Sequence, residues 1–275
     1  TIEFDENGVC NICRQKIYKD EKIDWKKRTE MLTRVIEKHR GKYEYDCILP
    51  FSGGKDSTYT LLYLVKHFNI RPLVVQFNHG FMRDNLLENN RRTFKKLGVD
   101  VISFTPNWKL VKRLMLETLI RKGDFCWHCH TGIFAYPMQI ALKYQVPLIF
   151  WGEPSSEYTA YYNYEENEIE QVDESRFNRF VNLGITAEDM HSMIKDDYQC
   201  DPRELGPYMY PKRRDLKKLK CQSVCLGSYI PWDVKANTKL IEDELGWCGD
   251  QVEGMPWEEY SYEKIECSMQ GMRDY

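Results

Sequence analysis

Twelve residues near the start of the chain decide the fold, and they are Asp46-Cys47-Ile48-Leu49-Pro50-Phe51-Ser52-Gly53-Gly54-Lys55-Asp56-Ser57. The first six are apolar after Asp46 and have the length of a strand, and apolar residues at helical spacing begin at Leu61. Two glycines between these segments allow the backbone to turn tightly and to approach a ligand. The stretch therefore predicts a buried strand, a glycine loop and a helix in direct succession.

This loop has the chemistry of an anion-binding site. The helix that follows would point its first N–H groups and the positive end of its dipole at the loop. Ser52 and Ser57 add hydroxyl donors, Lys55 adds a positive charge, and Asp56 can hold a Mg²⁺ ion that is bound to phosphate. The loop lacks the spacing of the ATPase P-loop and of dinucleotide-binding loops. The alternative is an ordinary glycine-rich turn.

Strand and helix signals alternate on both sides of the loop. Short apolar runs predict further strands at residues 72–77, 99–104 and 147–151, and helical spacing predicts helices at 25–39, 86–97, 110–120 and 131–144. This alternation implies parallel strands with covering helices, in a sheet core at about residues 43–155. After Gly152 the pattern changes, and residues 156–175 form an acidic, tyrosine-rich insertion or a cover over the substrate. A helix at 180–195, with Thr186 as its cap, and a strand at 224–230 are expected beyond it.

Composition limits the class of partner. The net charge is −3, whereas proteins that wrap nucleic acid usually have a basic surplus, so a smaller substrate is favoured. No run of 18 apolar residues and no secretion signal are visible, so a cytoplasmic protein without a membrane partner is expected. Ten cysteines then indicate metal or redox chemistry rather than disulfides.

Four of these cysteines form two CxxC pairs, Cys10–Cys13 and Cys126–Cys129. Zinc requires four ligands, so three interpretations are open: one joint site, two separate sites, or no metal. Cys47 lies in a predicted strand and is expected to be a core residue.

The loop Ser52–Ser57 resembles the SGGxDS signature of the PP-loop ATP pyrophosphatases. The resemblance implies that the loop grips the β,γ-pyrophosphate of ATP while the α-phosphate is attacked, which yields pyrophosphate and an adenylated substrate. It implies an α/β fold, a parallel sheet with helices on both faces, with the nucleotide at the carboxyl ends of the strands. Residues expected to bind nucleotide are then Ser52, Gly53, Gly54, Lys55, Asp56, Ser57, Phe77, Asn78, Gly80 and Gly152. Residues expected to act in the reaction are Lys55, Asp56 and Glu153, although Glu153 could equally be a helix cap or a surface carboxylate.

A more specific resemblance is to the N-acetyl sugar amidotransferase family, through motifs at Phe4–Cys13, Tyr45–Thr60, Cys126–Gly132, Trp151–Glu153, Tyr229–Asp233 and Gly271–Tyr275. It implies that the N-acetyl oxygen of a sugar is adenylated and that ammonia then displaces AMP to give an acetamidino sugar, for surface polysaccharide or lipopolysaccharide. The chain has no glutaminase signature, so the resemblance implies separate glutamine amidotransferase and cyclase-like subunits that supply ammonia.

The resemblance also bears on metals and on domain organisation. It implies a zinc knuckle in which Cys10 and Cys13 join a further CxxC pair ahead of Phe4, and a continuation beyond Tyr275, so truncation at both ends is expected. Cys126, Cys129 and Cys267 remain as a three-thiolate set, which holds an iron–sulfur cluster in the related tRNA thiolases; zinc or no metal are the alternatives. We divide the chain into a knuckle segment at 1–22, an ATP-binding domain at 23–155 and a helix-rich C-terminal substrate or partner region at 156–275. A PP-loop tRNA sulfurtransferase and a non-catalytic ATP-binding scaffold remain alternative functions.

Overall fold

A five-stranded parallel sheet forms the centre of the molecule in the computed structural model, which describes residues 2–152, 181–199, 201–251, 266–269 and 272. The strand order is β3-β2-β1-β4-β5, and every pair of neighbours is parallel. The strands are β1 (Cys47–Pro50), β2 (Pro72–Phe77), β3 (Asp100–Phe104), β4 (Leu148–Trp151) and β5 (Gln222–Cys225). The expected α/β fold is therefore confirmed.

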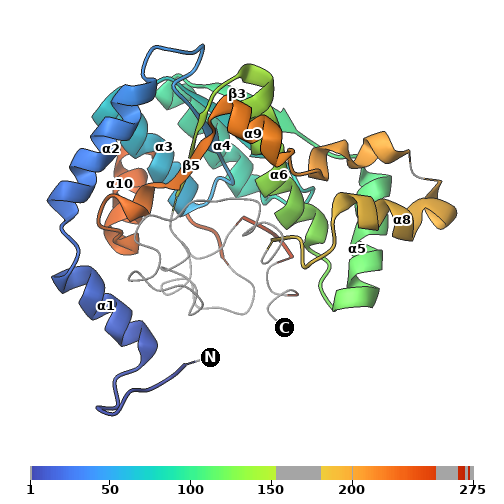
Figure 1. Cartoon of the computed structure of the whole chain (residues 1–275), viewed down its shortest axis with the longest axis horizontal. Coiled ribbons are helices and arrows are strands. Elements are labelled where there is room, and N and C mark those ends of the chain that lie inside the picture. Colours follow the sequence, from blue (N-terminus) through green and yellow to red (C-terminus); the bar gives the residue numbers. More distant parts are fainter. Residues whose placement is uncertain (1, 153–180, 200, 252–265, 270–271, 273–275) are drawn as a thin grey trace.

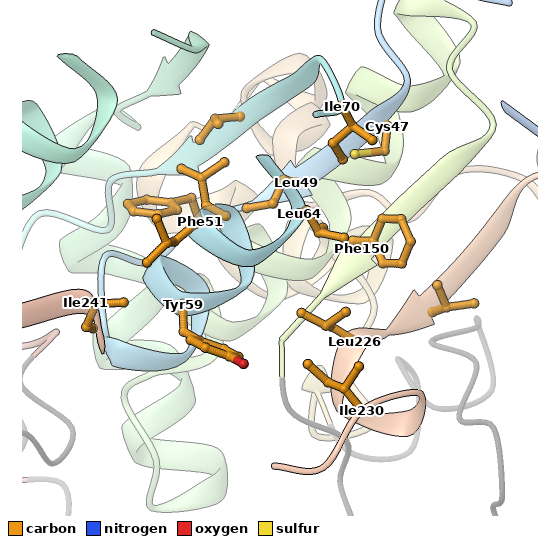
Figure 2. Packing of buried hydrophobic residues seen from close by; sticks show 14 of the residues in the cluster. Cys47, Leu49, Phe51, Tyr59, Leu64, Ile70, Phe150, Leu226, Ile230 and Ile241 are labelled. Carbon is orange, nitrogen blue, oxygen red and sulfur yellow. The ribbon is translucent and has the colours of Figure 1, made fainter. Parts of the chain in front are cut away.

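Four helices cover one face of the sheet: α2 (Trp25–His39), α3 (Lys55–Phe68), α4 (Asp84–Leu97) and α10 (Val234–Leu245). Their apolar side chains form one core cluster with the strand residues that point to this face. Figure 2 shows this packing, in which Leu49 of β1 and Phe150 of β4 lie beside Leu64 of α3. Cys47 belongs to this cluster and is fully buried, and its burial raises the pKa of the thiol. It is a core residue, as expected.

The opposite face is covered by α6 (Trp127–Tyr144) and α9 (Arg213–Leu219). Ile48 of β1 and Val75 of β2 point to this side, where they pack against Met138 of α6. Because β1 is buried on both faces, its sequence is a continuous apolar run rather than an alternating one. Helices thus lie on both faces of the sheet, as Figure 1 shows.

A third apolar cluster lies next to the end of β2, where α6 meets α5 (Trp108–Lys122), α8 (Ala187–Tyr198) and the 3-10 helix η3 (Pro202–Tyr208). Phe77 and Trp127 bury their rings here. The indole nitrogen of Trp127 donates to the carbonyl oxygen of Ile185 at 2.9 Å. This cluster fixes the first turn of α6 against the sheet edge that bears the loop.

Several elements differ from the sequence-based expectations. Helix α6 begins at Trp127 and so includes residues 127–130, which were expected to precede it. Helix α8 begins at Ala187 rather than near residue 180, because Thr186 and Asp189 form a reciprocal capping box there. The strand expected at 224–230 is shorter and ends at Cys225, where the short 3-10 helix η4 (Leu226–Ser228) follows. Helices α1 (Asn11–Glu21), α9 and α10 were not predicted.

The C-terminal region contributes directly to the sheet. Strand β5 pairs with β4 over four residues, and α10 packs against α3. The sheet core therefore extends beyond the predicted residues 43–155, because β5 enters from a point some seventy residues after β4. Helix α1 buries no side chain and extends away from the sheet in Figure 1. Among the helices that the structure describes, none is long and apolar enough to cross a membrane.

Candidate active site

The glycine loop joins the carboxyl end of β1 to the first turn of α3, as the sequence predicted. Gly53 has a φ of +94°, a conformation that side-chain-bearing residues rarely adopt, so the turn requires glycine. Gly54 is the N-cap of α3 and has no side chain to satisfy the first N–H groups of the helix. Those N–H groups therefore face the loop, where an anion would find hydrogen-bond donors and the positive end of the dipole.

The two loop serines hold the loop in shape. The hydroxyl oxygen of Ser57 accepts from the N–H of Gly53 at 3.1 Å, and that of Ser52 accepts from the N–H of Gly54 at 3.3 Å. The two hydroxyl oxygens lie 3.2 Å apart. Two backbone N–H groups and two hydroxyls are therefore gathered within one turn, where they are paired with each other. A phosphate oxygen that replaced these internal bonds would find donors of both kinds.

Lys55 and Asp56 form a buried ion pair at the start of α3. Their Nζ and Oδ2 atoms are 2.8 Å apart, and the side chains are 6% and 14% exposed. A charge pair with so little solvent interacts more strongly with a third charge than a surface pair does. The ammonium of Lys55 is thus fixed beside the loop, and the carboxylate of Asp56 is fixed beside the ammonium.

Gly152, at the end of β4, lies next to the same turn of α3. A Cβ atom at Gly152 would be 3.2 Å from the hydroxyl of Thr60 and 3.4 Å from the carbonyl carbon of Asp56. The structure thus brings Gly152 to the loop, as the sequence predicted. Glu153 lies outside the described residues, so its expected role stays a prediction.

The end of β2 lies beside the loop because β1 and β2 are neighbours. Asn78 there accepts from the N–H of Gly80 at 3.0 Å, and Gly80 has a φ of +91°. The ring of Phe77, in contrast, is 4% exposed and packs directly against Gly132 of α6. In this structure the backbone of Phe77 lies at the strand end, while its ring belongs to the core. An adenine contact by Phe77 stays a prediction.

Two buried histidines connect this strand end to α6. His79 is 4% exposed and His128 is 1% exposed, and burial lowers the pKa of each to about 4. Nδ1 of His79 accepts from the N–H of Phe81 at 3.3 Å, and Nε2 of His128 lies 3.4 Å from the carbonyl oxygen of His79. Both imidazoles are therefore neutral at pH 7 and act as structural links.

Cys126 and Cys129 lie in the first turn of α6, with Cys126 at its N-cap. Cys267 precedes Ser268, whose N–H and hydroxyl donate to the carbonyl oxygen of Phe81 at 2.9 and 3.2 Å. The ring centroids of Phe81 and His128 are in turn 6.4 Å apart, and His128 stands between Cys126 and Cys129 in the sequence of α6. All three cysteines thus border the same loop after β2.

Metal ligation by these cysteines stays a prediction. Within the described residues, no three His, Cys, Asp or Glu side chains are grouped closely enough to hold a metal ion.

The N-terminal cysteines occupy one tight knuckle. The carboxylate of Asp5 accepts from the N–H groups of Asn7 and Val9, both at 2.9 Å, and brings Phe4 into an antiparallel bridge with Cys10. The sulfur of Cys10 accepts from the N–H of Cys13 at 3.4 Å. Hydrogen bonds from Cys13 lower the pKa of the Cys10 thiol, whereas the neighbouring Cys10 raises that of Cys13. Two thiols on one short turn could supply half of the ligands that zinc requires, so zinc at Cys10 and Cys13 stays a prediction.

Three side chains that the sequence did not single out surround the loop glycines. A Cβ atom at Gly53 would overlap the side-chain amide of Asn90 from α4, and a Cβ atom at Gly54 would overlap the carboxylate of Glu266. The indole nitrogen of Trp247 donates to the carbonyl oxygen of Gly53 at 3.1 Å. Asn90 had one visible signal, since it is a polar residue on the apolar stripe of a predicted helix. Glu266 and Trp247 had none, because tertiary structure alone places them here.

Residues 247–251 dock on α4 next to the loop. The amide of Asn89 donates to the carbonyl oxygen of Cys248 at 2.7 Å and accepts from its N–H at 3.2 Å. The amide of Asn85 donates to the carbonyl oxygen of Gly249 at 2.6 Å. Together with the bond from Trp247 to Gly53, these contacts fix the segment to both α4 and the loop.

Comparisons with known proteins find similarity to two curated proteins over part of this chain. No protein-family model matches it. Over 130 residues it is 29% identical to an uncharacterized protein of Methanocaldococcus jannaschii, a match that covers 46% of this chain and 45% of that protein. Over 86 residues it is 33% identical to the glutamine-hydrolyzing GMP synthase of Pyrobaculum aerophilum, which covers 31% of this chain and 17% of the synthase. The chain therefore spans less than half the length of either curated relative.

Two solved structures are similar at low scores. An NMN synthetase from Francisella tularensis has a TM-score of 0.39 and 9% identity, over 85% of this chain and 99% of that one. The U34-tRNA thiolase NcsA from Methanococcus maripaludis, solved with its 4Fe–4S cluster, has a TM-score of 0.35 and 12% identity, over 91% of each chain. Likenesses of this strength do not identify a function.

Proposed function

We propose that this chain is an ATP-using enzyme of the PP-loop type, which transfers AMP to an oxygen atom of its substrate and releases pyrophosphate. The observation that carries the proposal is the loop Ser52–Ser57, which joins β1 to α3 and gathers backbone and hydroxyl donors beside a buried Lys55–Asp56 pair. The sequence similarity to a GMP synthase supports the same class of enzyme.

Each part of the loop has a distinct task in this reaction. The first turn of α3 would bind phosphate oxygens and orient the pyrophosphate as the leaving group, and the N–H groups of Gly53 and Gly54 would join it by exchanging their bonds to the loop serines for bonds to phosphate. Lys55 would neutralise the negative charge that develops there, and its burial strengthens this effect. No side-chain nucleophile is needed, because the substrate oxygen itself attacks the α-phosphate.

Asp56 fits the role of a magnesium ligand. Its carboxylate is held 2.8 Å from the ammonium of Lys55 in the first turn of α3, beside the phosphate donors, and carboxylate oxygens are the ligands that Mg²⁺ prefers. A bound Mg²⁺ would supply further charge neutralisation at the phosphates. Gly152, with no side chain, keeps the space between β4 and this turn clear.

For the substrate, we propose an N-acetylated sugar. An amide carbonyl is a poor electrophile, so ammonia cannot displace its oxygen directly. Adenylation of that oxygen creates AMP as a leaving group; ammonia then adds to the carbon, AMP departs and a proton is released to water, leaving an acetamidino group. Support comes from the motif resemblance and from the glutamine-hydrolyzing relative, since glutamine hydrolysis is a source of ammonia. Separate glutamine amidotransferase and cyclase-like subunits would deliver it.

Sulfur transfer to tRNA is the second candidate. The observation that favours it is the position of Cys126, Cys129 and Cys267 around the loop after β2, at the same end of the sheet as the phosphate loop. These three cysteines would be the residues to hold an iron–sulfur cluster, and such a cluster would supply the sulfur chemistry; they are not grouped closely enough for that in this structure. Zinc on Cys10 and Cys13, in contrast, would have a structural role under either function.

The nucleotide products, followed by ³¹P NMR, test these proposals. The protein receives Mg-ATP with ammonium salt and N-acetylated sugars in one arm, and with bulk tRNA and a sulfur source in another. AMP and pyrophosphate in the sugar arm alone would support amidotransfer, and the same products in the tRNA arm alone would move the chain to sulfur transfer. ADP and phosphate would contradict the PP-loop reaction, and nucleotide binding without turnover in any arm would favour an ATP-binding scaffold.

A further inference from the structure

The core-facing stripe of α4 is unusually polar where it approaches the loop. Its buried residues follow helical spacing, and three of the four are polar: Leu86, Asn89, Asn90 and Thr93. Asn89 has a structural explanation, because its amide binds the backbone of Cys248 in both directions. That explanation does not apply to Asn90, whose amide makes no such bond among the described residues.

Among the residues that the structure describes, the buried amide of Asn90 has no hydrogen-bond partner. The residue is 3% exposed, and neither its Oδ1 nor its Nδ2 atom is hydrogen-bonded within the part of the chain that the structure describes. Buried side-chain amides are nearly always paired, because leaving them unpaired costs the hydration that water would provide. A leucine of similar size would avoid this cost, so stability alone does not account for an amide at this position.

The amide points at the phosphate loop. Packing of Phe94 against Phe51, with ring centroids 4.9 Å apart, holds α4 beside the residue that precedes the loop. One turn earlier on the same helix, the amide of Asn90 occupies the space where a Cβ atom of Gly53 would lie. Gly53 therefore does more than permit the turn: its missing side chain lets a polar group from α4 reach the loop backbone.

We propose that Asn90 is a further nucleotide-contacting residue, whose amide donates a hydrogen bond to a phosphate oxygen of the ATP that Ser52–Ser57 holds. The inference rests on the proposed function and deepens it, because it makes α4 a third element of the phosphate site. An amide NH₂ group is a donor that suits an anionic oxygen. The nucleotide would then supply the partner that the described residues do not.

Calorimetric titration with Mg-ATP, inorganic pyrophosphate and adenosine tests the proposal on the wild type and on Asn90→Leu. We expect the variant to bind ATP and pyrophosphate about tenfold more weakly, because one hydrogen bond to a charged group is lost. Adenosine affinity should not change. The ligand-free variant should unfold at the same temperature as the wild type or at a higher one, because an unpaired buried amide has been removed. A purely structural role for Asn90 would instead lower that temperature.

Two further variants separate this effect from general damage. Asn237→Leu is the matched control, since Asn237 is a buried amide on α10 whose Nδ2 atom also has no partner among the described residues; its phosphate affinities should equal those of the wild type. Asn90→Asp keeps the shape of the side chain but places a carboxylate against the phosphates, so it should bind ATP more weakly than Asn90→Leu.

The possible results divide clearly. Pyrophosphate and ATP affinities of Asn90→Leu within about twofold of the wild type would overturn the role of Asn90. The same conclusion would follow if adenosine affinity fell equally, or if Asn237→Leu weakened binding as much. If the wild type bound neither ATP nor pyrophosphate, the proposed function would fail, and this inference with it. If the wild type bound both ligands and Asn90→Leu bound them with the same affinities, the role of Asn90 would fail while the proposed function would remain.

Discussion

At the scale of single residues, the buried Lys55–Asp56 pair is the most consequential feature of the loop. Lysine is rarely buried, because its charge loses hydration, unless a partner compensates for that loss. Here the partner is the adjacent carboxylate, so the ammonium is held in place before any phosphate arrives. Such preorganised charge is usually a large part of the rate enhancement in an enzyme.

We therefore expect Lys55→Met to lower the rate of pyrophosphate release by about 10²–10³-fold, as the loss of one transition-state donor does in other enzymes. Methionine retains most of the length of the side chain and removes its charge and its N–H donors. The measurement is a pyrophosphate-release assay with the substrate found in the NMR experiment. Lys66→Met on the same helix is the control, because Lys66 pairs with Glu244 at the surface and its removal should leave the rate unchanged. A Lys55 variant with the wild-type rate would contradict the assigned role.

Glu266 introduces a competing negative charge. Its carboxylate lies against Gly54, where the phosphates of ATP are proposed to bind. Glu266→Gln should therefore bind ATP about two- to fivefold more tightly, since a like charge near the phosphates is removed. Calorimetric titration checks this, with Glu244→Gln as a surface variant of equal net charge. Weaker binding by Glu266→Gln would instead indicate that this carboxylate helps to hold the metal ion.

At the scale of elements, the contact between α6 and β2 depends on a glycine inside a helix. Glycine normally destabilises a helix interior by about 1 kcal/mol relative to alanine. At Gly132, however, a Cβ atom would overlap the ring of Phe77. The glycine thus lets α6 lie close to the strand whose end borders the loop.

Gly132→Ala should accordingly destabilise the protein by about 1–3 kcal/mol, the usual cost of overpacking, despite its better helix propensity. The free energy of unfolding in urea is the quantity to measure. A double-mutant cycle with Phe77→Leu, which shortens the opposing side chain, should recover part of the loss. Stabilisation by Gly132→Ala alone would show that the helix and strand are not in close contact.

Local patterns predicted the elements of the sheet core well but not the C-terminal elements. The strand at 72–77 and the helix at 25–39 match the structure, because their apolar spacing is clear over the whole element. Helix α1 was missed because it buries no side chain and so has no apolar stripe. The sheet placement of β5 was missed because four residues from a distant segment identify a strand partner only after folding.

The candidate site shows the same division. Ser52–Ser57 and Gly152 were found because a strand, a loop and a helix follow in order, and parallel strands end at one edge of the sheet. Asn90, Trp247 and Glu266 were not found, because they come from three segments that only the tertiary structure brings to the loop. The packing of the Phe77 ring against Gly132 of α6 was not foreseen either, and the expected contact of Phe77 with the nucleotide stays a prediction.

At the scale of the whole molecule, buried histidines make stability depend on pH. The pKa of His79 in the folded protein is about 4, well below the value of about 6.5 expected after unfolding. At a pH between these two pKa values, His79 is protonated in the unfolded protein and neutral in the folded protein. The contribution of the neutral histidine is thus complete above pH 6.5 and is lost as the pH falls from about 6.5 toward 4.

His79→Asn should therefore weaken the decline in unfolding free energy between pH 7.5 and pH 5, while it retains an acceptor for the N–H of Phe81. Urea unfolding at several pH values in this range measures the slope. His67, which is exposed on α3, provides the comparison, since His67→Asn should leave the slope unchanged. Equal slopes in the wild type and in His79→Asn would show that His79 is not buried in its neutral form.

The hydrogen bond from Trp247 to Gly53 has a thermodynamic consequence for binding at the segment that it joins to the loop. It joins the phosphate loop to residues 247–251, which dock on α4 through Asn85 and Asn89. A nucleotide that shifts Gly53 must change the free energy of that docking. Coupling between two binding equilibria is reciprocal. If the nucleotide changes the affinity of a protein for residues 247–251, that protein changes the affinity for the nucleotide by the same factor. The affinity of such a protein would then depend on whether ATP is bound, without any contact between that protein and the ATP.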